Sequence, residues 1–513
     1  MTIDISPMLK VSVEQFYGIE YEGFPCQIAQ VGMWLTDHQM NLRVSEQFGV
    51  YFARLPLTHS ATIVHENALR IDWESVVSKH QLSYILGNPP FVGYKFQTEE
   101  QKKDMLSVYL DSKGKPYNYA GKIDYVSAWY YKTAEYIKDT FIRVAFVSTN
   151  SITQGEQVAN VWKPIFEMFD IKICFAYRTF KWVNEAKGKA AVYCVIIGFS
   201  NRASSDRVIY DGDDVINATN INPYLIDAPN IFIENRKKPL FDVPEITDGN
   251  RPTDGGHLII EGADYDEFIS KEPNAIPYIK RYMMAREFLH NEKRYCLWLV
   301  GCSPKVLQQM PLVMARIEKV RQFRLASTKK ATQDHAQTPT WFQEIREPRA
   351  EYIVIPFTSS ERRRYIPMGY LSKDTIAGAG GLFMLQDATL YHFGILTSNV
   401  HMAWTRAVCG RLEMRYRYSK DIVYNNFPWP EASDAQREQI EKLAQSVLDA
   451  RANYSDSSLA DLYDPLTMPP DLLKAHQNLD RAVMKLYGFP VKDFAEADCV
   501  AALMKLYELI TLE

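Results

Sequence analysis

The sequence contains no closely spaced pair of cysteines. Its seven cysteines include no C-x-x-C pair and no close Cys/His cluster, which argues against a zinc site, so that no bound metal is expected. The same pattern fits a reducing compartment, where thiols stay unpaired. The cysteines are Cys26, Cys174, Cys194, Cys296, Cys302, Cys409 and Cys499.

Long apolar runs and a strong charge of one sign are also missing. No stretch reaches the length that a membrane span requires, and the N-terminus lacks the pattern of a signal peptide. We therefore expect a cytoplasmic protein with no membrane partner. The formal net charge is only −4, so any binding to nucleic acid must depend on a local basic surface rather than on a global field.

What is present over residues 13–200 is an alternation of strand-like and helix-like segments. Short apolar runs that end in polar residues alternate with segments of helical periodicity, and the last two runs predict a β-hairpin around 183–189. This order is typical of an α/β fold with a doubly wound sheet, made mixed by the terminal hairpin. The expected strands are 13–20, 61–69, 82–88, 142–152, 171–182 and 191–200, and the expected helices are 23–41 and 123–140.

The pattern changes near residue 205. Pro, Asn and Asp punctuate the chain over 212–275, basic and aromatic residues interleave over 278–430, and helical periodicity returns after 431. A chain of 513 residues is too long for one ordinary domain. We therefore expect an α/β domain over 1–205, an α+β domain over 206–430 and a small helical domain over 431–513.

The strand expected at 82–88 runs into the turn Asn88-Pro89-Pro90-Phe91. Side chains at the carboxyl end of a parallel strand project into the crevice where such sheets bind ligands. The Asn88 side-chain oxygen and the Pro89 carbonyl can each accept one N–H of an exocyclic amine, which drives the nitrogen toward a nucleophilic geometry, ready to attack a methyl group. Phe91 can stack on a base flipped out of the duplex. A turn that merely closes a core strand is the alternative.

This turn, its strand and the acid-ended strand at 13–20 resemble the amino-directed DNA methyltransferases, whose signature is Asp, Asn or Ser, then Pro-Pro, then Tyr, Phe or Trp. The closer resemblance is to the MmeI-like restriction–modification enzymes, in which nuclease, helical linker, methyltransferase, target-recognition and C-terminal domains share one chain. It extends over essentially the whole sequence and implies an incomplete Rossmann-like class I methyltransferase sheet, a target-recognition domain and a helical C-terminal domain. The most specific stretches are "LGNPPFVGYK", "YRTFKWVNEAKGKAAVYCVIIGF", "RYCLWL" and "GRLEMRYRYSKDIVYNNFPWP".

The resemblance also implies a set of cofactor-binding residues. Glu20 would bind the ribose hydroxyls of S-adenosyl-L-methionine, and Tyr21 would lie beside the adenine of that cofactor. Asn67, together with Ala68, falls where the family places a residue near the adenine amine, although an aspartate is frequent at that place. The turn at 88–91 would be the catalytic turn.

Two aromatic residues of the expected hairpin fall in the segment that resembles the aromatic target-base element of the family. Phe180 or Trp182 would contact the flipped base. Packing of the hairpin core explains both residues equally well.

A glycine-rich cofactor loop is missing where the resemblance requires it. Such a domain opens with a strand and a loop whose backbone N–H groups cradle the cofactor, about twenty residues before the acid that ends the second strand, but the first glycine here is Gly18. We interpret the cluster "AGAGG" at 377–381 as a flexible loop of the recognition region. We expect impaired cofactor binding, which a separate N-terminal chain carrying the loop and the nuclease could restore.

Basic residues in the segments 315–342 and 359–367 suit contact with DNA phosphates, with a solvated charged face as the alternative. In 409–419, an extended strand would place Arg411, Glu413 and Arg415 on one face, where arginine can read guanine and glutamate can accept from cytosine. The resemblance supports this recognition role, and a surface strand with ion pairs is the alternative. The expected phosphate contacts are Arg321, Arg324, Lys329, Lys330, Arg362, Arg363 and Arg364.

The leading interpretation is the adenine-N6 DNA methyltransferase and target-recognition portion of a restriction–modification protein, with S-adenosyl-L-methionine as donor and double-stranded DNA as substrate. The alternative is a sequence-specific DNA-binding subunit or remnant without chemistry of its own. A protein glutamine methyltransferase, which uses a similar turn on an amide nitrogen, is disfavoured because an exposed peptide loop needs no long basic and aromatic recognition segment.

Overall fold

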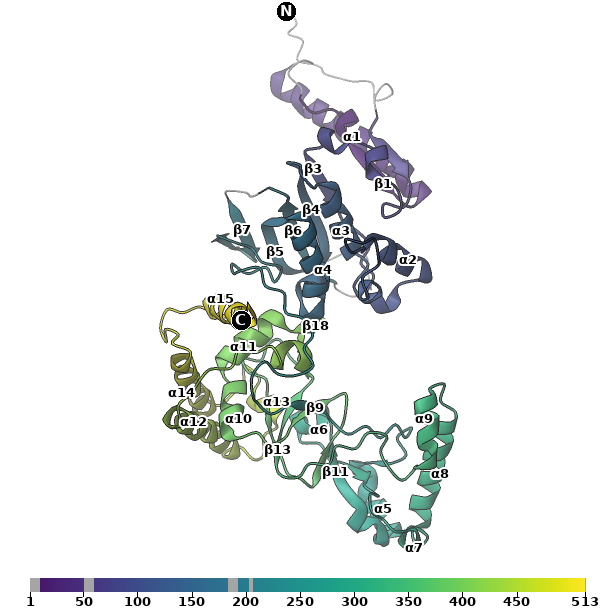
Figure 1. Ribbon diagram of the computed structural model, residues 1–513, viewed down its shortest axis with the longest axis vertical. Helices are drawn as coiled ribbons and strands as arrows, with labels where there is room; N and C mark the ends of the chain where they lie inside the picture. The colour runs from purple at the N-terminus through teal and green to yellow at the C-terminus, as the bar shows by residue number, and fades with distance from the viewer. Residues whose placement is uncertain (1–9, 50–59, 183–191, 203–205, 513) are drawn as a thin grey trace, which may run out of the picture. The chain divides into compact units, whose positions relative to one another are not determined.

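The chain folds into two compact units (Figure 1). One unit consists of residues 1–152 and 157–225, and the other of 153–156 and 226–513. The computed structural model describes residues 10–49, 60–182, 192–202 and 206–512. Over these ranges, no helix combines the length and apolar character needed to cross a membrane.

The first unit is built on a six-stranded mixed sheet. Its strands are β3 (Tyr84–Gly87), β4 (Arg143–Thr149), β5 (Lys172–Trp182), β6 (Val192–Ser200), β7 (Arg207–Asp211) and β8 (Asp214–Ala218). They lie in the order β3-β4-β6-β5-β7-β8, with β3 parallel to β4 and β6 antiparallel to β4 and β5. The expected hairpin of β5 and β6 is confirmed, and its loop at 183–189 lies outside the described residues. The sheet continues past the boundary expected at 205.

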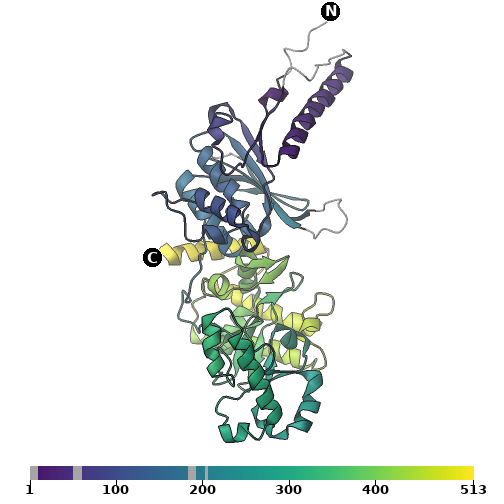
Figure 2. The ribbon, with the colours of Figure 1, turned by 90° about the vertical axis from the view of Figure 1, so that its right-hand side faces the viewer.

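A separate pair of parallel strands precedes this sheet in the chain. β1 (Tyr17–Glu20) pairs with β2 (Thr62–His65), and the long helix α1 (Gly23–Phe48) connects them (Figure 2). The apolar spacing over 23–41 predicted this helix, which continues beyond the predicted end. Among the described residues no strand joins β1 to β3, so β1 and β2 form a sheet of their own.

Aromatic packing holds the centre of the six-stranded sheet. The helices beside it are α2 (Glu99–Val108), α3 (Ser127–Tyr136) and α4 (Gly155–Phe169). The buried ring of Tyr130 on α3 lies 5.3 Å from Phe146 on β4 and 5.3 Å from Trp162 on α4, edge to face. The Tyr130 hydroxyl donates to Ser148 Oγ at 3.2 Å. Since β4 lies directly beside β3, this core fixes the carboxyl end of β3.

The described part of the second unit contains three small sheets, surrounded by helices. The first sheet has the strand order β10 (Ile259–Glu261), β12 (Arg294–Leu297), β11 (Ile279–Met283) and β16 (Thr375–Ala377). The second has the order β15 (Gly369–Leu371), β13 (Tyr352–Pro356), β17 (Leu382–Leu385) and β9 (Ile246–Asp248). The third has the order β14 (Thr358–Ser359), β19 (Arg415–Arg417) and β18 (Gly410–Leu412). The helices are α5 (Tyr265–Lys271), α6 (Ala285–His290), α7 (Pro304–Leu307), α8 (Pro311–Leu325), α9 (Lys330–Asp334), α10 (Leu390–Leu396) and α11 (Asn399–Val408). The expected α+β character is confirmed.

The glycine cluster at 377–381 is not the flexible loop that we expected. Gly378 is buried between β16 and β17, and a Cβ there would overlap the side chain of Tyr282. A Cβ on Gly249 would lie 2.5 Å from the carbonyl carbon of Gly378. Glycine permits such close approach of backbones, so the cluster is a packed joint between two sheets.

The described residues after 431 are helical, as the periodicity predicted. They form α12 (Asp434–Ala452), α13 (Leu459–Leu462), α14 (Pro470–Leu486) and α15 (Glu496–Leu512). A buried carboxylate ties α14 to the rest of the second unit. Asp480 accepts a hydrogen bond from the Tyr365 hydroxyl at 2.6 Å and from the Asn399 backbone N–H at 2.8 Å. Burial raises the pKa of Asp480 to about 6. The tail is therefore packed against the recognition region by polar as well as apolar contacts.

Candidate active site and DNA-contact residues

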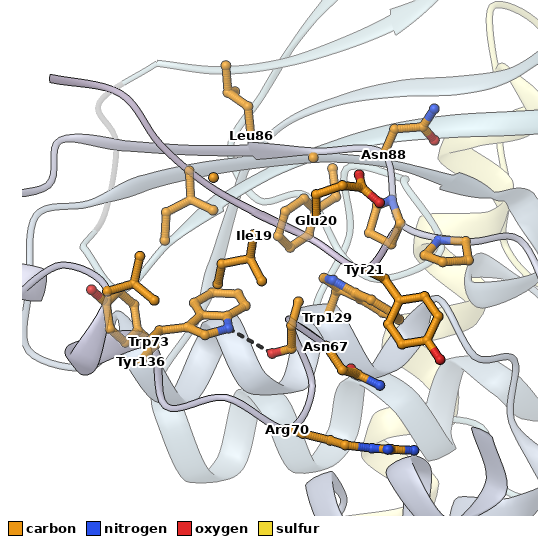
Figure 3. A pocket seen from close by; sticks show the side chains of 18 of the residues that line it. Ile19, Glu20, Tyr21, Asn67, Arg70, Trp73, Leu86, Asn88, Trp129 and Tyr136 are labelled. Atoms are coloured by element: carbon orange, nitrogen blue, oxygen red, sulfur yellow. Dashed lines mark hydrogen bonds between the residues drawn. The ribbon is translucent and has the colours of Figure 1, made fainter. Parts of the chain in front are cut away.

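A cavity of about 690 Å³ opens in the first unit at the carboxyl ends of β1 and β3 (Figure 3). Cavities that bind small molecules fall in this size range. Glu20 is the last residue of β1, and Asn88 directly follows β3; both line the cavity, as do Trp73 and Trp129. The carboxyl ends of two strands thus bring together a carboxylate, an amide and aromatic surface, as expected for an open α/β sheet.

Asn88 is exposed at the mouth of the cavity. Within the described residues, no hydrogen bond engages its side chain or the carbonyl oxygen of Pro89. The following residues are fixed: the Tyr125 N–H donates to the Val92 carbonyl at 2.9 Å, and the Tyr94 N–H donates to Asp124 Oδ1 at 3.0 Å. The turn therefore presents two unused acceptors on an anchored backbone.

Phe91 is half-buried and does not line the cavity, whereas Pro89 and Pro90 do. The stacking role expected of Phe91 stays a prediction.

Glu20 and Tyr21 lie at the end of β1. The Glu20 carboxylate accepts from the backbone N–H of Glu22, the residue before α1, at 3.1 Å, which orients it at that end of the strand. The Tyr21 ring is 59% exposed and lies along the cavity. Both residues thus keep surface available to a ligand, in the place where the sequence predicted them.

Asn67 and Ala68 line the same cavity on a loop after β2. Asn67 Oδ1 accepts from the Leu69 N–H at 2.9 Å, and its Nδ2 donates to Asp104 at 3.2 Å. The Ala68 carbonyl accepts from the Trp73 indole N–H at 2.8 Å (Figure 3). The Asn67 side chain therefore shapes the loop, while the loop forms part of the cavity wall.

Sequence reasoning missed Asp104, which organises this wall. Asp104 is buried on α2, pairs with Arg70 at 2.7 Å, and accepts from the Tyr125 hydroxyl at 2.8 Å. Burial raises the pKa of Tyr125, and the hydrogen bond to the Asp104 carboxylate raises it further. The hydroxyl therefore stays protonated and acts as a donor. A single aspartate in a polar helix gives no signal of such a role, because its burial depends on tertiary packing.

Phe180 and Trp182 lie near the end of β5, with ring centroids 6.2 Å apart. Trp182 is 39% exposed and Phe180 is half-buried, and neither lines the cavity. A register shift between Tyr177 and Phe180 twists the strand just before them. Their contact with a flipped base stays a prediction.

Arg411, Glu413 and Arg415 do not lie on one face of an extended strand, and that expectation is wrong. β18 and β19 form a tight hairpin in which Arg411 pairs with Tyr416 and Leu412 with Arg415. Cross-strand partners share a face and successive residues alternate, so Arg411 and Arg415 point to opposite faces. Glu413 occupies the turn with a φ of 60°.

The same hairpin directs its three charged side chains differently. The Arg411 guanidinium stacks 4.3 Å from the centre of the Tyr416 ring and donates to the carbonyls of Met414 and Arg406. Arg415 is 46% exposed and pairs with Glu413 at 3.1 Å. Arg411 therefore holds the hairpin, whereas Arg415 and Glu413 are available at its surface.

Arg324 is not available to phosphate, which corrects a second expectation. Its side chain is fully buried and donates to five backbone carbonyls, those of Pro252, Thr253, His335, Thr338 and Trp341, at 2.7–3.0 Å. It ties α8 to two loops of the recognition region. Burial lowers its pKa from the usual arginine value.

The other expected phosphate contacts differ in their accessibility. Arg321 makes a two-fold contact with Glu318, and Lys330 pairs with Asp334 at 2.8 Å; all four side chains remain solvated. Arg363 is half-buried, and burial lowers its pKa. Lys329, Arg362 and Arg364 are exposed.

No group of three or more metal-ligating His, Cys, Asp or Glu side chains occurs in the portions of the chain that the structure covers.

Three family models match consecutive parts of the chain. They are described as the MmeI DNA-methyltransferase domain, over residues 2–211, the MmeI target recognition domain, over 227–431, and the MmeI C-terminal domain, over 432–513.

Two individual proteins resemble the chain over nearly its whole length. "DNA methyltransferase A" of Bacillus subtilis (strain 168) is 40% identical over 507 residues, which make up 98% of this chain but only 56% of that relative. A solved structure of the type IIL restriction–modification enzyme MmeI in complex with DNA is 46% identical, with a TM-score of 0.88, and the match covers 100% of this chain and 68% of that one. The chain therefore belongs to the MmeI family of restriction–modification enzymes and spans its methyltransferase, target-recognition and C-terminal domains.

Proposed function

We propose that this chain carries the methyl-transfer and DNA-recognition functions of a restriction–modification enzyme, with the amino nitrogen N6 of adenine as the methyl acceptor. The observation that carries the proposal is the pair of unused acceptors, the Asn88 amide oxygen and the Pro89 carbonyl, at the cavity that Glu20 also lines. Membership of the MmeI family supports the DNA substrate.

The cavity suits S-adenosyl-L-methionine as the methyl donor. When bound, this cofactor supplies a methyl group on a positively charged sulfur. Glu20, at the end of β1, would accept hydrogen bonds from the ribose hydroxyls, and Tyr21 with the loop of Asn67 and Ala68 would enclose the adenine. The volume of about 690 Å³ and the aromatic walls fit a nucleoside.

The Asn88-Pro89 turn would prepare the acceptor amine. Two hydrogen bonds, to the Asn88 amide oxygen and the Pro89 carbonyl, draw the two N–H groups out of the plane of the base and leave the nitrogen lone pair directed at the methyl group. The proline pair keeps both acceptors in place without a penalty of reorganisation. The amine loses one proton after transfer, so no base is needed beforehand.

The target base must leave the duplex to reach this turn. Phe91, together with Phe180 or Trp182, would supply aromatic surface for the extruded base. The exposed cations Lys329, Arg362 and Arg364 would contact phosphates, and Arg415 with Glu413 would contact base edges in the major groove.

Transfer of a labelled methyl group tests the proposal. The chain is incubated with radiolabelled S-adenosyl-L-methionine and unmethylated plasmid DNA, and the nucleosides are separated after digestion. We expect the label in N6-methyladenine. Label in 4-methylcytosine alone would contradict the choice of base. Tight DNA binding without transfer, even when the rest of the B. subtilis relative is supplied as a separate chain, would favour the alternative of a DNA-binding subunit.

Two arginine substitutions separate base reading from phosphate binding. Replacing Arg415 by alanine should cost about 1–3 kcal/mol of discrimination at one base pair of the site, because its exposed guanidinium is at the hairpin surface. Replacing Arg362 should weaken binding to all sequences equally and reduce the salt dependence of the dissociation constant. Binding to a panel of single-base variants at several salt concentrations distinguishes the two, and Arg411→Ala serves as the control for damage to the hairpin.

A further inference from the structure

We propose that Tyr125 is a positioning residue for methyl transfer, because it joins the segment that carries Asn88 to the cavity wall that carries Asn67. The two asparagines line one cavity from segments that are separate in the chain (Figure 3). Tyr125 lines the same cavity and is 5% exposed. The inference rests on the proposed function, in which the Asn88 turn holds the acceptor amine and the Asn67 wall encloses the methyl donor.

The backbone and the side chain of Tyr125 contact different segments. Its backbone N–H donates to the Val92 carbonyl, in the segment that continues the catalytic turn, at 2.9 Å. Its hydroxyl donates to Asp104 Oδ2 at 2.8 Å. Asp104 also accepts from Asn67 Nδ2 at 3.2 Å and from Arg70 Nε at 2.7 Å. Tyr125 and one buried carboxylate therefore form a bridge between the turn and the wall.

The bridge is held firmly at both of its ends. At one end Asp104 is 4% exposed, and hydrogen bonds to a carboxylate are about twice as strong as those between neutral groups. At the other end Asp124, the residue before Tyr125, accepts from the Tyr94 N–H at 3.0 Å and from the Ser151 hydroxyl at 2.5 Å. The segment after the catalytic turn is therefore anchored by two consecutive residues, of which one also contacts the wall.

Loss of the hydroxyl alone would separate placement from binding. Methyl transfer requires the acceptor nitrogen and the methyl carbon in line, and a misplacement of about 1 Å costs about 10²-fold in rate. Without the hydroxyl, the Asn67 side chain keeps its bond from the Leu69 N–H, and the turn keeps the backbone bond from Tyr125 to Val92. Each reactant should therefore still bind, while the placement of one relative to the other becomes less exact.

Methyl-transfer kinetics of Tyr125→Phe test the proposal. This variant keeps the ring, which lies edge to face with Trp129 at 5.2 Å. We expect kcat to fall about tenfold or more, with KM for cofactor and for DNA nearly unchanged. Tyr109→Phe is the matched control: it removes a buried hydroxyl that donates to the Ser127 carbonyl at 3.1 Å, away from the cavity lining, and should transfer at the normal rate. A normal kcat for Tyr125→Phe, or an equal loss in both variants, overturns the proposal.

Hydrogen exchange of the full chain, without cofactor or DNA, tests the bridge independently of methyl transfer. The backbone amides of Arg70 and Ile71 donate to the Asn67 carbonyl at 2.9 and 3.0 Å. In Tyr125→Phe these two amides should exchange faster than in the unsubstituted chain, while those of β4 should not change. Unchanged exchange at both amides, or faster exchange throughout the first unit, overturns the proposal. A chain that shows the local change but transfers no methyl group to DNA contradicts the proposed function and leaves the bridge intact.

Discussion

Replacing Asn88 by alanine should reduce the rate of methyl transfer by about 10²–10³-fold or more while leaving DNA affinity and the free energy of unfolding unchanged. The substitution removes one of the two acceptors that would hold the amine. It should not disturb the fold, because the side chain is exposed and makes no hydrogen bond within the described residues. Single-turnover transfer of a labelled methyl group measures the rate, under conditions in which the unsubstituted chain is active.

Two further variants show whether a slower methyl transfer is specific to the acceptor on the Asn88 side chain. Asn118 is another exposed asparagine of the first unit, away from the cavity lining, and Asn118→Ala should transfer methyl at the normal rate. Asn88→Asp should retain part of the activity, because a carboxylate also accepts an N–H. Activity of Asn88→Ala within a few-fold of the unsubstituted chain would show that another group prepares the amine.

Replacing Arg324 by alanine should lower the free energy of unfolding of the second unit by about 3–5 kcal/mol. Five backbone carbonyls lose the guanidinium as a donor. Those of Pro252, His335 and Thr338 keep a backbone N–H donor, whereas a carbonyl left dry without any donor would cost about 1–3 kcal/mol. Water that enters the vacated space can donate to these carbonyls, which lowers the total cost. Urea unfolding followed by the fluorescence of Trp298 and Trp341 measures the change.

Arg321→Ala is the matched control for Arg324. It lies on the same helix, but its ion pair with Glu318 is solvated, so its loss should change stability by less than about 1 kcal/mol. If Arg324→Ala instead folds normally and loses DNA affinity, the arginine contacts phosphate and the buried arrangement is wrong.

The strands that position the cavity could be predicted from sequence because each is a short apolar run ending at a polar residue. Glu20 and Asn88 could be expected to meet, since the carboxyl ends of parallel strands share one edge of a sheet. α4 could not be predicted in this way, because Pro164 lies in its interior and proline normally breaks a helix. The role of Asp104 could not be predicted, because its partners come from loops that are distant in the sequence.

The two corrections in the recognition region have different physical causes. The residues Glu413 and Met414 form a two-residue turn, but neither is the glycine or asparagine that usually marks one. The segment 411–415 was therefore treated as one continuous strand with alternating faces, although the chain reverses direction within it. Arg324 did leave a signal. It continues the buried helical series Val313, Ile317 and Val320, and its position in that apolar series indicated burial more strongly than its charge indicated DNA.

The left-handed backbone at residue 413 limits how this hairpin can diversify. A φ of 60° is strained for most side chains and easy for glycine and asparagine. A library randomised at 413 and 415 should therefore yield well-folded members from a small set of amino acids at the first position and a broad set at the second. New base preferences in this lineage would then arise more readily through position 415, with position 413 restricted by the geometry of the turn.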